Sequence, residues 1–277
     1  MSSSDLGRGV LHPRRSAAVV SMSRHEPTVG LARFVEFYWL VRWDRRGRPA
    51  HEQKVLAHPN IYLVFEAPRA HVYGVDRSLF VRRLEGAGHV LGVKFRPGGF
   101  RPFTDRPVAE LADRVVPATA ILGATADTVN QAVLRSSDAS TLVTRVESFL
   151  LARLPEPDPV AEQVAAMVEH ITAATDLRTV DQVAERFGVT VRRLQRLFHE
   201  YVGAGPKWVL RRARLHEATR RADHGTDVSW ATLADELGYA DQAHFTRDFT
   251  AAVGISPARY TGRGLRLDPA RPDDSGR

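Results

Sequence analysis

The chain of 277 residues contains no cysteine. Disulfides, thiolate metal sites, iron–sulfur clusters and cysteine nucleophiles are therefore excluded. The chain also lacks any run approaching the roughly 18 consecutive apolar residues that a membrane-spanning helix needs. The apolar stretch from Ala17 to Val20 is too short for the core of a secretory signal. These absences predict a cytoplasmic protein that does not engage a membrane.

Acidic and basic residues are balanced over most of the chain, with one exception. The whole chain carries 39 Lys and Arg against 32 Asp and Glu, a formal net charge of +7. The 32 residues from Thr190 to Arg221 hold 9 basic and 2 acidic residues, which leaves 30 of each sign elsewhere. A solvated helix surface would also produce such a cluster. Because the whole excess falls in one segment, however, we interpret it as a candidate contact surface for a polyanion.

Changes in composition along the chain predict two domains between loose ends, and apolar residues at 43% are enough to form their cores. Three prolines within five residues, Pro155, Pro157 and Pro159, are typical of a stiff linker. Met22 is a second candidate for the start of translation. The predicted divisions are a disordered basic tail (1–25), a β-rich domain with C-terminal helices (26–155), a linker (156–159), a helical domain (160–264) and a disordered tail (265–277).

The first domain is expected to be a small antiparallel sheet or barrel. Dense runs of β-branched and aromatic residues are separated by glycines and by turn-forming pairs such as Pro59-Asn60. The expected strands cover residues 34–43, 61–65, 71–75, 79–81 and 90–95. Apolar residues at steps of three and four then predict helices over 128–134 and 141–154. The fold class is therefore α+β, with an all-α domain after the linker.

The most informative feature of the second domain is an internal repeat at an offset of 50–51 residues. Each half is typical of a helix-turn-helix, with a helix, a glycine turn and a second helix. Thr179 and Thr190 are expected to cap the two helices of the first half, and Gly188 to adopt the left-handed conformation between them. Residues 206–222 predict a long helix that joins the halves.

The outward residues of the second helix in each half suit the reading of DNA bases. Arginine can bond the O6 and N7 atoms of guanine, and glutamine the N6 and N7 atoms of adenine. Arg196 and Arg247 occupy equivalent positions of the repeat. Backbone phosphates need only positive charge and hydrogen-bond donors. The expected phosphate contacts are Thr190, Arg193, Lys207, Arg211, Arg212 and Arg214. A rigid joining helix would hold the two reading helices about 34 Å apart, one turn of DNA.

These residues together resemble the AraC/XylS family of transcriptional regulators, over almost all of Thr179 to Tyr260. The second half carries the most specific match, Leu237-Gly238-Tyr239 followed by Phe245-Thr246-Arg247-Asp248-Phe249 and Gly254-Ile255-Ser256-Pro257. Arg221-Ala222 departs from the family, which usually has two apolar residues there. The resemblance implies seven helices and two successive major-groove segments. We expect RNA polymerase as a partner, with the protein acting as an activator or as a repressor of transcription. The base-contacting roles that it implies fall on Arg192, Gln195, Arg196, Gln242, His244 and Arg247. For Gln242 an alternative is capping of the helix near Asp241.

The first domain is similar to an uncharacterised domain that precedes such modules, through His58-Pro59-Asn60-Ile61-Tyr62 and Gly92-Val93-Lys94-Phe95-Arg96. In the wider family this position holds a domain that senses an effector or forms a dimer. We therefore expect an unknown small-molecule effector or a dimer contact, in a monomer or a homodimer. The ligand-binding candidates are Tyr38, Trp39, His58, Tyr62 and Arg96.

An enzyme or metal-binding β domain tethered to a DNA-binding module is the alternative. His51, His58, His71 and His89 support it, but they lack the close His-x-His spacing of two ligands on one strand. No Ser/His/Asp set or pair of carboxylates is typical of a catalytic site. Arg96 either holds an anion or braces its turn. We therefore expect a regulator that binds double-stranded DNA, has no cofactor and no metal, and is not an enzyme.

Overall fold

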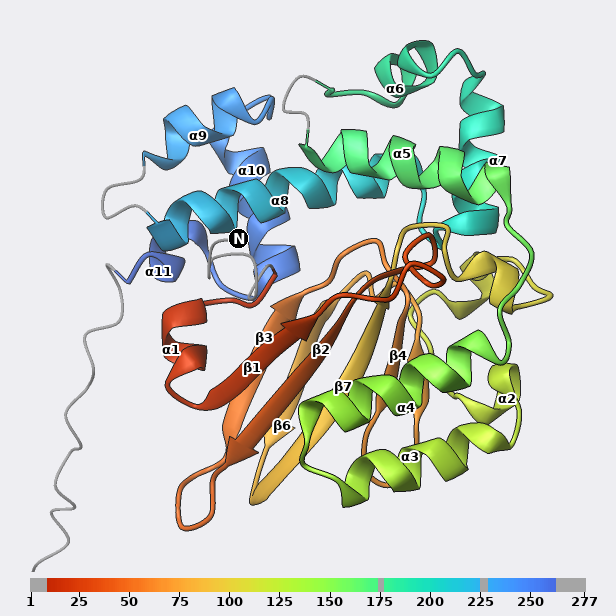
Figure 1. Ribbon diagram of the computed structural model, residues 1–277. Helices are drawn as coiled ribbons and strands as arrows, with labels where there is room; N and C mark the ends of the chain where they lie inside the picture. Colours follow the sequence, from red (N-terminus) through yellow and green to blue (C-terminus); the bar gives the residue numbers. More distant parts are fainter. Residues whose placement is uncertain (1–8, 174–176, 225–228, 263–277) are drawn as a thin grey trace, which may run out of the picture. The chain divides into compact units, whose positions relative to one another are not determined.

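The computed structural model describes residues 9–173, 177–224 and 229–262. It divides into two compact units, residues 1–213 and 214–277, within helix α8 (Pro206–His224). An antiparallel sheet domain in the first unit precedes the helices of the C-terminal part, as the sequence predicts (Figure 1). The α+β fold class is thereby confirmed.

The sheet domain is built on a six-stranded antiparallel sheet in the order β1-β2-β7-β4-β5-β8. Its strands are β1 (Val20–His25), β2 (Val35–Asp44), β4 (Tyr62–Phe65), β5 (His71–Tyr73), β7 (Ala87–Phe95) and β8 (Val115–Pro117). A separate two-stranded sheet consists of β3 (His51–Leu56) and β6 (Leu79–Leu84). The chain in this region therefore forms a sheet with a second small sheet rather than one closed barrel.

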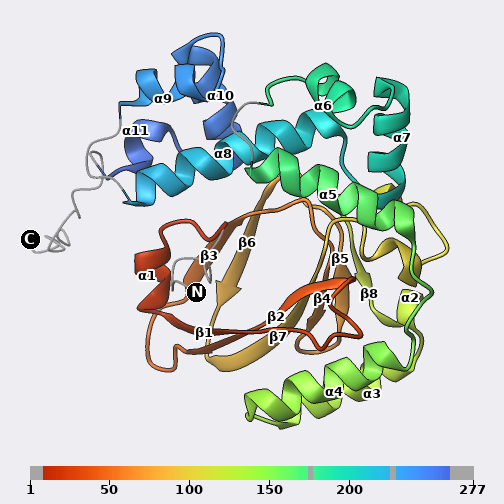
Figure 2. The same cartoon turned by 45° about the horizontal axis from the view of Figure 1, so that its top comes forward.

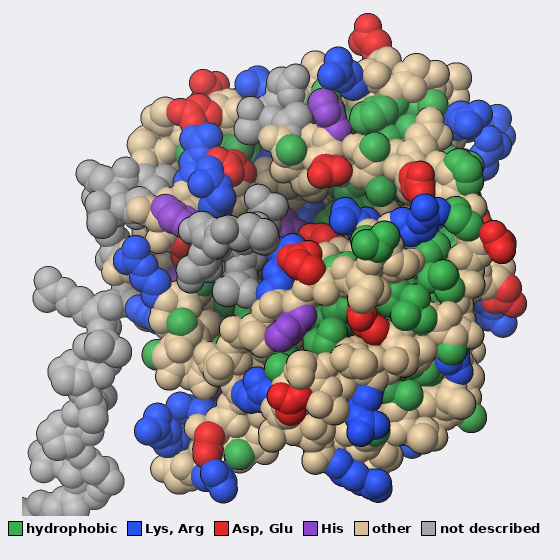
Figure 3. Space-filling view, in the orientation of Figure 1, with side chains coloured by type: hydrophobic (Ala, Val, Ile, Leu, Met, Phe, Trp, Pro, Cys, Tyr) green, Lys and Arg blue, Asp and Glu red, His purple; other side chains and the backbone are tan. Residues whose placement is uncertain are grey.

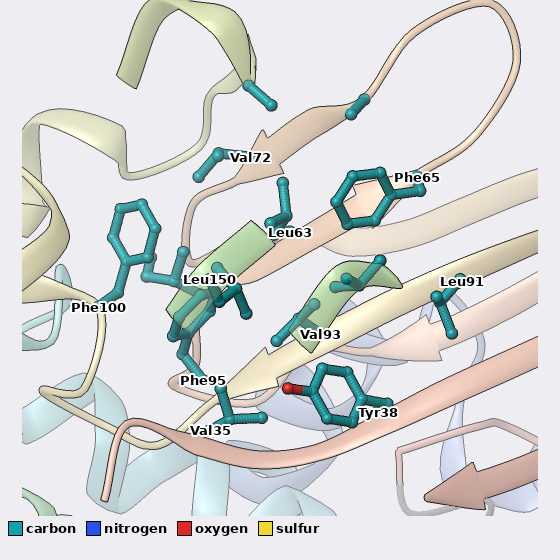
Figure 4. Packing of buried hydrophobic residues seen from close by; sticks show 14 of the residues in the cluster. Val35, Tyr38, Leu63, Phe65, Val72, Leu91, Val93, Phe95, Phe100 and Leu150 are labelled. Atoms are coloured by element: carbon teal, nitrogen blue, oxygen red, sulfur yellow. The ribbon is translucent and has the colours of Figure 1, made fainter. Parts of the chain in front are cut away.

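One face of the large sheet carries the core of the domain. The register places Tyr38 opposite Val93 and Leu40 opposite Leu91, and all four are buried. Figure 4 shows Tyr38, Leu91 and Val93 among Phe65, Phe95 and Leu150. Because side chains alternate along a strand, this face is apolar over its whole width and needs a covering layer.

Two amphipathic helices supply that layer. Helix α3 (Thr125–Arg135) and helix α4 (Ala139–Leu151) bury Val133, Val146 and Leu150 against the sheet. The side chain of Asp138 caps α4 by accepting a hydrogen bond from the backbone N–H of Thr141 at 2.8 Å. The remaining short helices of this domain are α1 (Pro13–Ala17), η2 (Arg101–Phe103), η3 (Val108–Leu111) and α2 (Thr119–Leu122).

The helices that follow the prolines form the rest of the fold. In the first unit, α5 (Pro159–Ala173), α6 (Val180–Arg186) and α7 (Val191–Tyr201) enclose a core that includes Val168, Leu194 and Phe198. The second unit holds α9 (Trp230–Glu236), α10 (Gln242–Val253) and α11 (Pro257–Tyr260). Its aromatic core is made of Trp230, Tyr239, Phe245, Phe249 and Tyr260.

The prediction of a disordered tail over residues 1–25 is wrong for residues 9–25. Strand β1 pairs with β2 along its whole length, from Val20 opposite Trp43 to His25 opposite Tyr38. Met22 and Arg24 alternate with serines, and this short amphipathic strand gains its hydrogen bonds only from a distant edge. Residues 1–8 and the tail predicted over 265–277 lie outside the described residues.

Candidate nucleic-acid interface

Two helix caps and one glycine fix the backbone geometry of the first helix-turn-helix. Thr179 and Gln182 form a capping box at the start of α6, and the hydroxyl of Thr190 accepts a hydrogen bond from the N–H of Arg193 at the start of α7. Gly188 lies between the helices with φ +62°, where a side chain would be strained. The caps and the left-handed turn predicted from the sequence are confirmed.

Helix α7 turns one face inward and the other to solvent. Leu194, Leu197 and Phe198 are buried in the core of this subdomain. The exposed side chains of the helix are Arg192, Arg193, Gln195, Arg196 and His199. The three predicted base-contacting residues of the first half therefore share one solvent-facing surface, with a formal charge that suits a groove lined by phosphates.

The second helix-turn-helix repeats the backbone geometry of the first. Gly238 has φ +72°, and the N–H of Tyr239 donates to the carbonyl of Ala234 at 2.9 Å. In the first half the N–H of Val189 donates to the carbonyl of Ala184, also at 2.9 Å. The same pattern of hydrogen bonds in the two halves shows that the sequence repeat is a repeat of structure.

The described geometry also decides the role of Asp241. Its Oδ1 accepts a hydrogen bond from the N–H of His244 at 2.6 Å, so Asp241 is the N-cap of α10 and Gln242 is the first helical residue. Gln242, His244 and Arg247 are all exposed. Asp241 thus matches Thr190 at the offset of 51, and Arg247 matches Arg196. The capping alternative for Gln242 is therefore wrong.

The residues predicted to contact phosphates do not share one environment. Lys207 and Arg211 are exposed, whereas Arg214 is half-buried with its guanidinium 5.7 Å from the ring centre of Tyr239. Arg212 is 3% exposed. Its NH2 donates to the carbonyl of Arg77 at 2.9 Å, its guanidinium lies over Trp208, and burial lowers its pKa to about 10. The prediction that Arg212 contacts phosphate is wrong, because its side chain faces the sheet domain.

Two further arginines of the basic segment are neutralised locally. Burial opposes ionisation of Glu217, but hydrogen bonds from Arg220 and Arg221 prevail and lower the pKa of this carboxyl. Arg221 also pairs with Glu236 of α9. The solvent-exposed positive charge of the segment outside these ion pairs lies mainly on α7 and at the start of α8.

Basic side chains gather in a second place, at the turn between β2 and β3. Figure 3 shows a group of them at the lower end of the sheet domain. Arg46 there pairs with Asp44 at 2.5 Å, and Arg45 donates to the carbonyl of Pro49. These arginines are engaged within their own turn, so they do not add to the helix-turn-helix surface.

Helix α7 is attached to the sheet domain within the first unit. Arg101 of η2 pairs with Glu200 at 2.7 Å, and the hydroxyl of Tyr201 donates to Asp158 at 2.8 Å. Gly203 packs against Val108 of η3, which would lie 3.2 Å from a Cβ at that position. The sequence offered no signal for the contacts of Glu200 with Arg101 and of Gly203 with Val108, because these partners are about 100 residues apart and belong to no shared motif.

The five ligand-binding candidates do not converge on one place. Tyr38 is fully buried in the core, its hydroxyl 3.3 Å from Glu147, and burial raises its pKa. It is therefore not a ligand contact. Arg96 donates to the carbonyl of Ala32 at 2.7 Å, which is the bracing role. His58 lies beside Gly9. Only Trp39 and Tyr62 share a face, the one opposite the buried core.

The four histidines of the alternative interpretation are likewise dispersed. His71 contacts Glu66 at 3.0 Å, and His89 contacts the carbonyl of Val133 at 3.0 Å. His51 belongs to β3, and His58 lies beyond its end. Within the described ranges, no three His, Asp or Glu side chains are grouped so that they could hold a metal ion. No helix of those ranges is long and apolar enough to cross a membrane.

Comparison with known proteins matches both parts of the chain. Residues 183–263 match the family described as a helix-turn-helix domain, and residues 23–117 match a domain of unknown function (DUF6597). The probable transcription factor PqrA of Proteus vulgaris is 30% identical over 89 residues, which cover 32% of this chain and 72% of that protein. The chain belongs to the AraC/XylS family of transcriptional regulators.

Other members of the AraC/XylS family match over the same region. The transcriptional activator RhaS of Pectobacterium carotovorum is 36% identical over 75 residues, 27% of this chain and 26% of RhaS. The chain thus spans about a quarter of the length of that relative. An AraC-type regulator of Chromobacterium violaceum, a solved structure, is 25% identical over 38% of this chain and 91% of its own, with a TM-score of 0.32. The chain therefore carries a helix-turn-helix DNA-binding domain of the kind that these transcription regulators contain.

Proposed function

We propose that the protein regulates transcription by sequence-specific binding, with α7 and α10 reading successive major-groove segments of double-stranded DNA. The observation that carries this proposal is the repeated geometry of the two halves. Each half presents an exposed arginine, Arg196 or Arg247, in the second turn of the helix that follows the same glycine turn. An arginine at such a position can form a bidentate contact with guanine.

The other readers extend this surface on each helix. Arg192 and Gln195 lie beside Arg196, and Gln242 and His244 precede Arg247 on α10. Thr190 accepts a hydrogen bond from Arg193, which leaves the hydroxyl proton of Thr190 free to donate to a phosphate. Arg193, Lys207 and Arg211 supply positive charge for the same purpose, and Arg214 joins them from α8.

The sheet domain is the proposed regulatory part. We infer that it binds a small-molecule effector or forms a dimer contact, and that the regulator recruits RNA polymerase as an activator. The attachment of η3 and η2 to α7 supports this role, because a change in the sheet domain reaches a reading helix through direct contacts such as Arg101 with Glu200. Allosteric coupling of this kind requires an effector site, a DNA-binding site and a structural element that contacts both.

Selection of bound sequences from a random DNA library tests the reading roles. Arg196→Ala and Arg247→Ala are each expected to relax base preference at one position, in different half-sites, by roughly 1–3 kcal/mol. Arg145→Ala, an exposed arginine of α4, is the matched control and should leave the selected sequence unchanged. Wild-type preference in both reading variants would refute the assignment.

A further inference from the structure

Helix α10 carries one acidic side chain that the proposed DNA contacts do not explain. Asp241 is the N-cap of the helix, whereas Asp248 lies in its middle, directly after the proposed reader Arg247. A negative charge at that place opposes the attraction between the helix and the phosphates of DNA. The side chain of Asp248 is only 14% exposed, so it is not a freely solvated surface group. The contacts of Asp248 within α10 indicate a role for it.

Asp248 faces the ring of His244, one turn earlier on the same helix. Its Oδ2 lies 3.9 Å from Nε2 of His244, a distance at which the two groups attract each other once the ring is protonated. The ring of Tyr239, in the glycine turn, meets the ring of His244 edge-on with 5.3 Å between their centres. Helix α10 packs against α9 and α11 (Figure 2), and the imidazole nevertheless remains 48% exposed. It is thus held on two sides and keeps a side open to solvent.

The first half of the repeat lacks this arrangement. At the positions that correspond to Tyr239, His244 and Asp248 it has Val189, Arg193 and Leu197. Leu197 is buried in the apolar core of its subdomain, so an acid at the same position of the second half gives up apolar burial. Because the two halves share their backbone geometry, the pair of His244 and Asp248 is a property of the sequence of α10. The helix-turn-helix fold by itself does not require it.

A carboxylate beside one ring nitrogen of a histidine decides how the other nitrogen meets a base. In a neutral ring the carboxylate favours the tautomer with its proton on Nε2, which leaves Nδ1 as an acceptor. In a protonated ring both nitrogens are donors. Cytosine offers only a donor in the major groove, whereas guanine and thymine offer only acceptors. The protonation state of such a ring therefore selects between cytosine and the pair of guanine and thymine.

The other charged groups around the ring act less directly on it. Oδ1 of Asp241 accepts a hydrogen bond from the backbone N–H of His244 at 2.6 Å. Arg214 of α8 lies with its guanidinium 5.7 Å from the ring centre of Tyr239, and Arg247 is exposed. Across the part of the chain that the structure describes, only Asp248 places a carboxylate oxygen within 4.0 Å of a ring nitrogen of His244. Asp248 is therefore the group that orients this ring.

We propose that Asp248 is a positioning residue for base reading, and that its pair with His244 makes one base preference of the second half-site depend on pH. Asp248 engages Nε2, so Nδ1 is the ring nitrogen left for a base. His244 then reads cytosine with a neutral ring and guanine or thymine with a protonated ring. The inference rests on the proposed function, because it assigns a determinant of specificity within the same DNA-contacting surface.

Selection of sequences bound by the full chain at about pH 5.5 and at about pH 8, with ionic strength held constant, tests the pair. The selected sequences should differ at one position of the half-site whose preference Arg247→Ala relaxes. There the ratio of cytosine to guanine plus thymine is expected to rise at least about fivefold from the lower to the higher pH. The half-site read by α7 should keep its preferences, because the corresponding Arg193 keeps its charge over this range.

Three variants show which side chain causes the change. His244→Gln removes the titrating ring and should abolish the dependence on pH. Asp248→Asn should reduce it by at least half, because an amide can donate to Nε2 as well as accept from it and no longer fixes the tautomer. Asp235→Asn removes the same charge from an exposed acid of α9 and is the matched control, which should keep the full dependence on pH.

The outcomes separate this inference from the proposed function. Equal base preferences at the two pH values throughout the second half-site of the wild-type chain overturn the inference without any variant. An Asp248→Asn chain that folds, by circular dichroism, and keeps the full change overturns it too. Sequence-specific binding with preferences that do not depend on pH leaves the proposed function standing. Absence of any preferred sequence at either pH refutes the proposed function and the inference with it.

Discussion

At the scale of single residues, burial separates side chains that look equivalent in the sequence. Lys207, Arg211 and Arg212 occur within six positions of one helix, and all three suit phosphate contacts by charge. The helix nevertheless directs Arg212 into the first unit, where its NH1 has no hydrogen-bond partner and its NH2 bonds a carbonyl. Periodicity predicts which residues share a helix face, but not which face a distant sheet covers.

Substitution of these residues should have separable effects on DNA binding. Lys207→Ala is expected to weaken binding to all sequences alike and to lower the salt slope by about one unit, because one phosphate contact is lost. Arg212→Met should leave the slope unchanged, because the buried guanidinium releases no counterion. Affinities measured from low to high salt give both slopes. An unchanged slope for Lys207→Ala removes that residue from the interface.

At the scale of elements, local chemistry determines the helices better than the strands. The caps Thr179 and Thr190 and the turns at Gly188 and Gly238 were predictable, since each depends on a few neighbouring residues. Strands β1 and β3 were not predicted. Each is half polar, as the sequence His51-Glu52-Gln53-Lys54 shows, and becomes a strand only by pairing with a distant partner.

The ion pairs that Glu217 forms with Arg220 and Arg221 on α8 should make the second unit sensitive to pH. The pKa of Glu217 is lowered in the folded chain, so its stabilising effect is present above its unfolded value and is lost as the pH falls through the folded value. Glu217→Gln is expected to cost about 1 kcal/mol from pH 7 down to pH 4.5, the ordinary pKa of a glutamate, and progressively less below it, as the pH falls through the lowered folded pKa. Urea unfolding at several pH values measures this difference.

Glu185→Gln provides the control for that experiment. Glu185 is an exposed glutamate of α6, and its substitution should change the free energy of unfolding by little at any pH. A difference between wild type and Glu217→Gln that stays constant as the pH falls well below 4.5 would mean that the ion pairs contribute nothing that depends on ionisation.

At the scale of the whole molecule, the division of the chain differs from the one that its prolines indicate. Pro155, Pro157 and Pro159 predict a boundary near residues 156–159, yet α5, α6 and α7 fall in the same compact unit as the sheet domain. The contacts of Val108 with Gly203 and of Arg101 with Glu200 cross that linker. A proline-rich segment limits local conformation, but it does not prevent packing between its two sides.

Substitution at this contact tests whether sheet and α7 unfold together. Val108 is fully buried, and Val108→Ala should destabilise the first unit by about 2 kcal/mol and lower hydrogen-exchange protection in α7 as well as in the sheet. Val115→Ala, at an exposed position of β8, should change neither. Loss of protection confined to the sheet would favour the boundary at the prolines.

The amino-acid sequence by itself determined the DNA-binding half of the chain, because a duplicated helix-turn-helix depends on local signals: helix caps, glycine turns and the spacing of apolar residues. The exposed residues Arg196 and Arg247 followed directly from that periodicity. Only the tertiary structure decided the environment of Arg212, the attachment of α7 and the cluster around Glu66. Glu66, Tyr73 and Arg82 come from three separate segments, and strand pairing across long loops brings them within hydrogen-bonding distance.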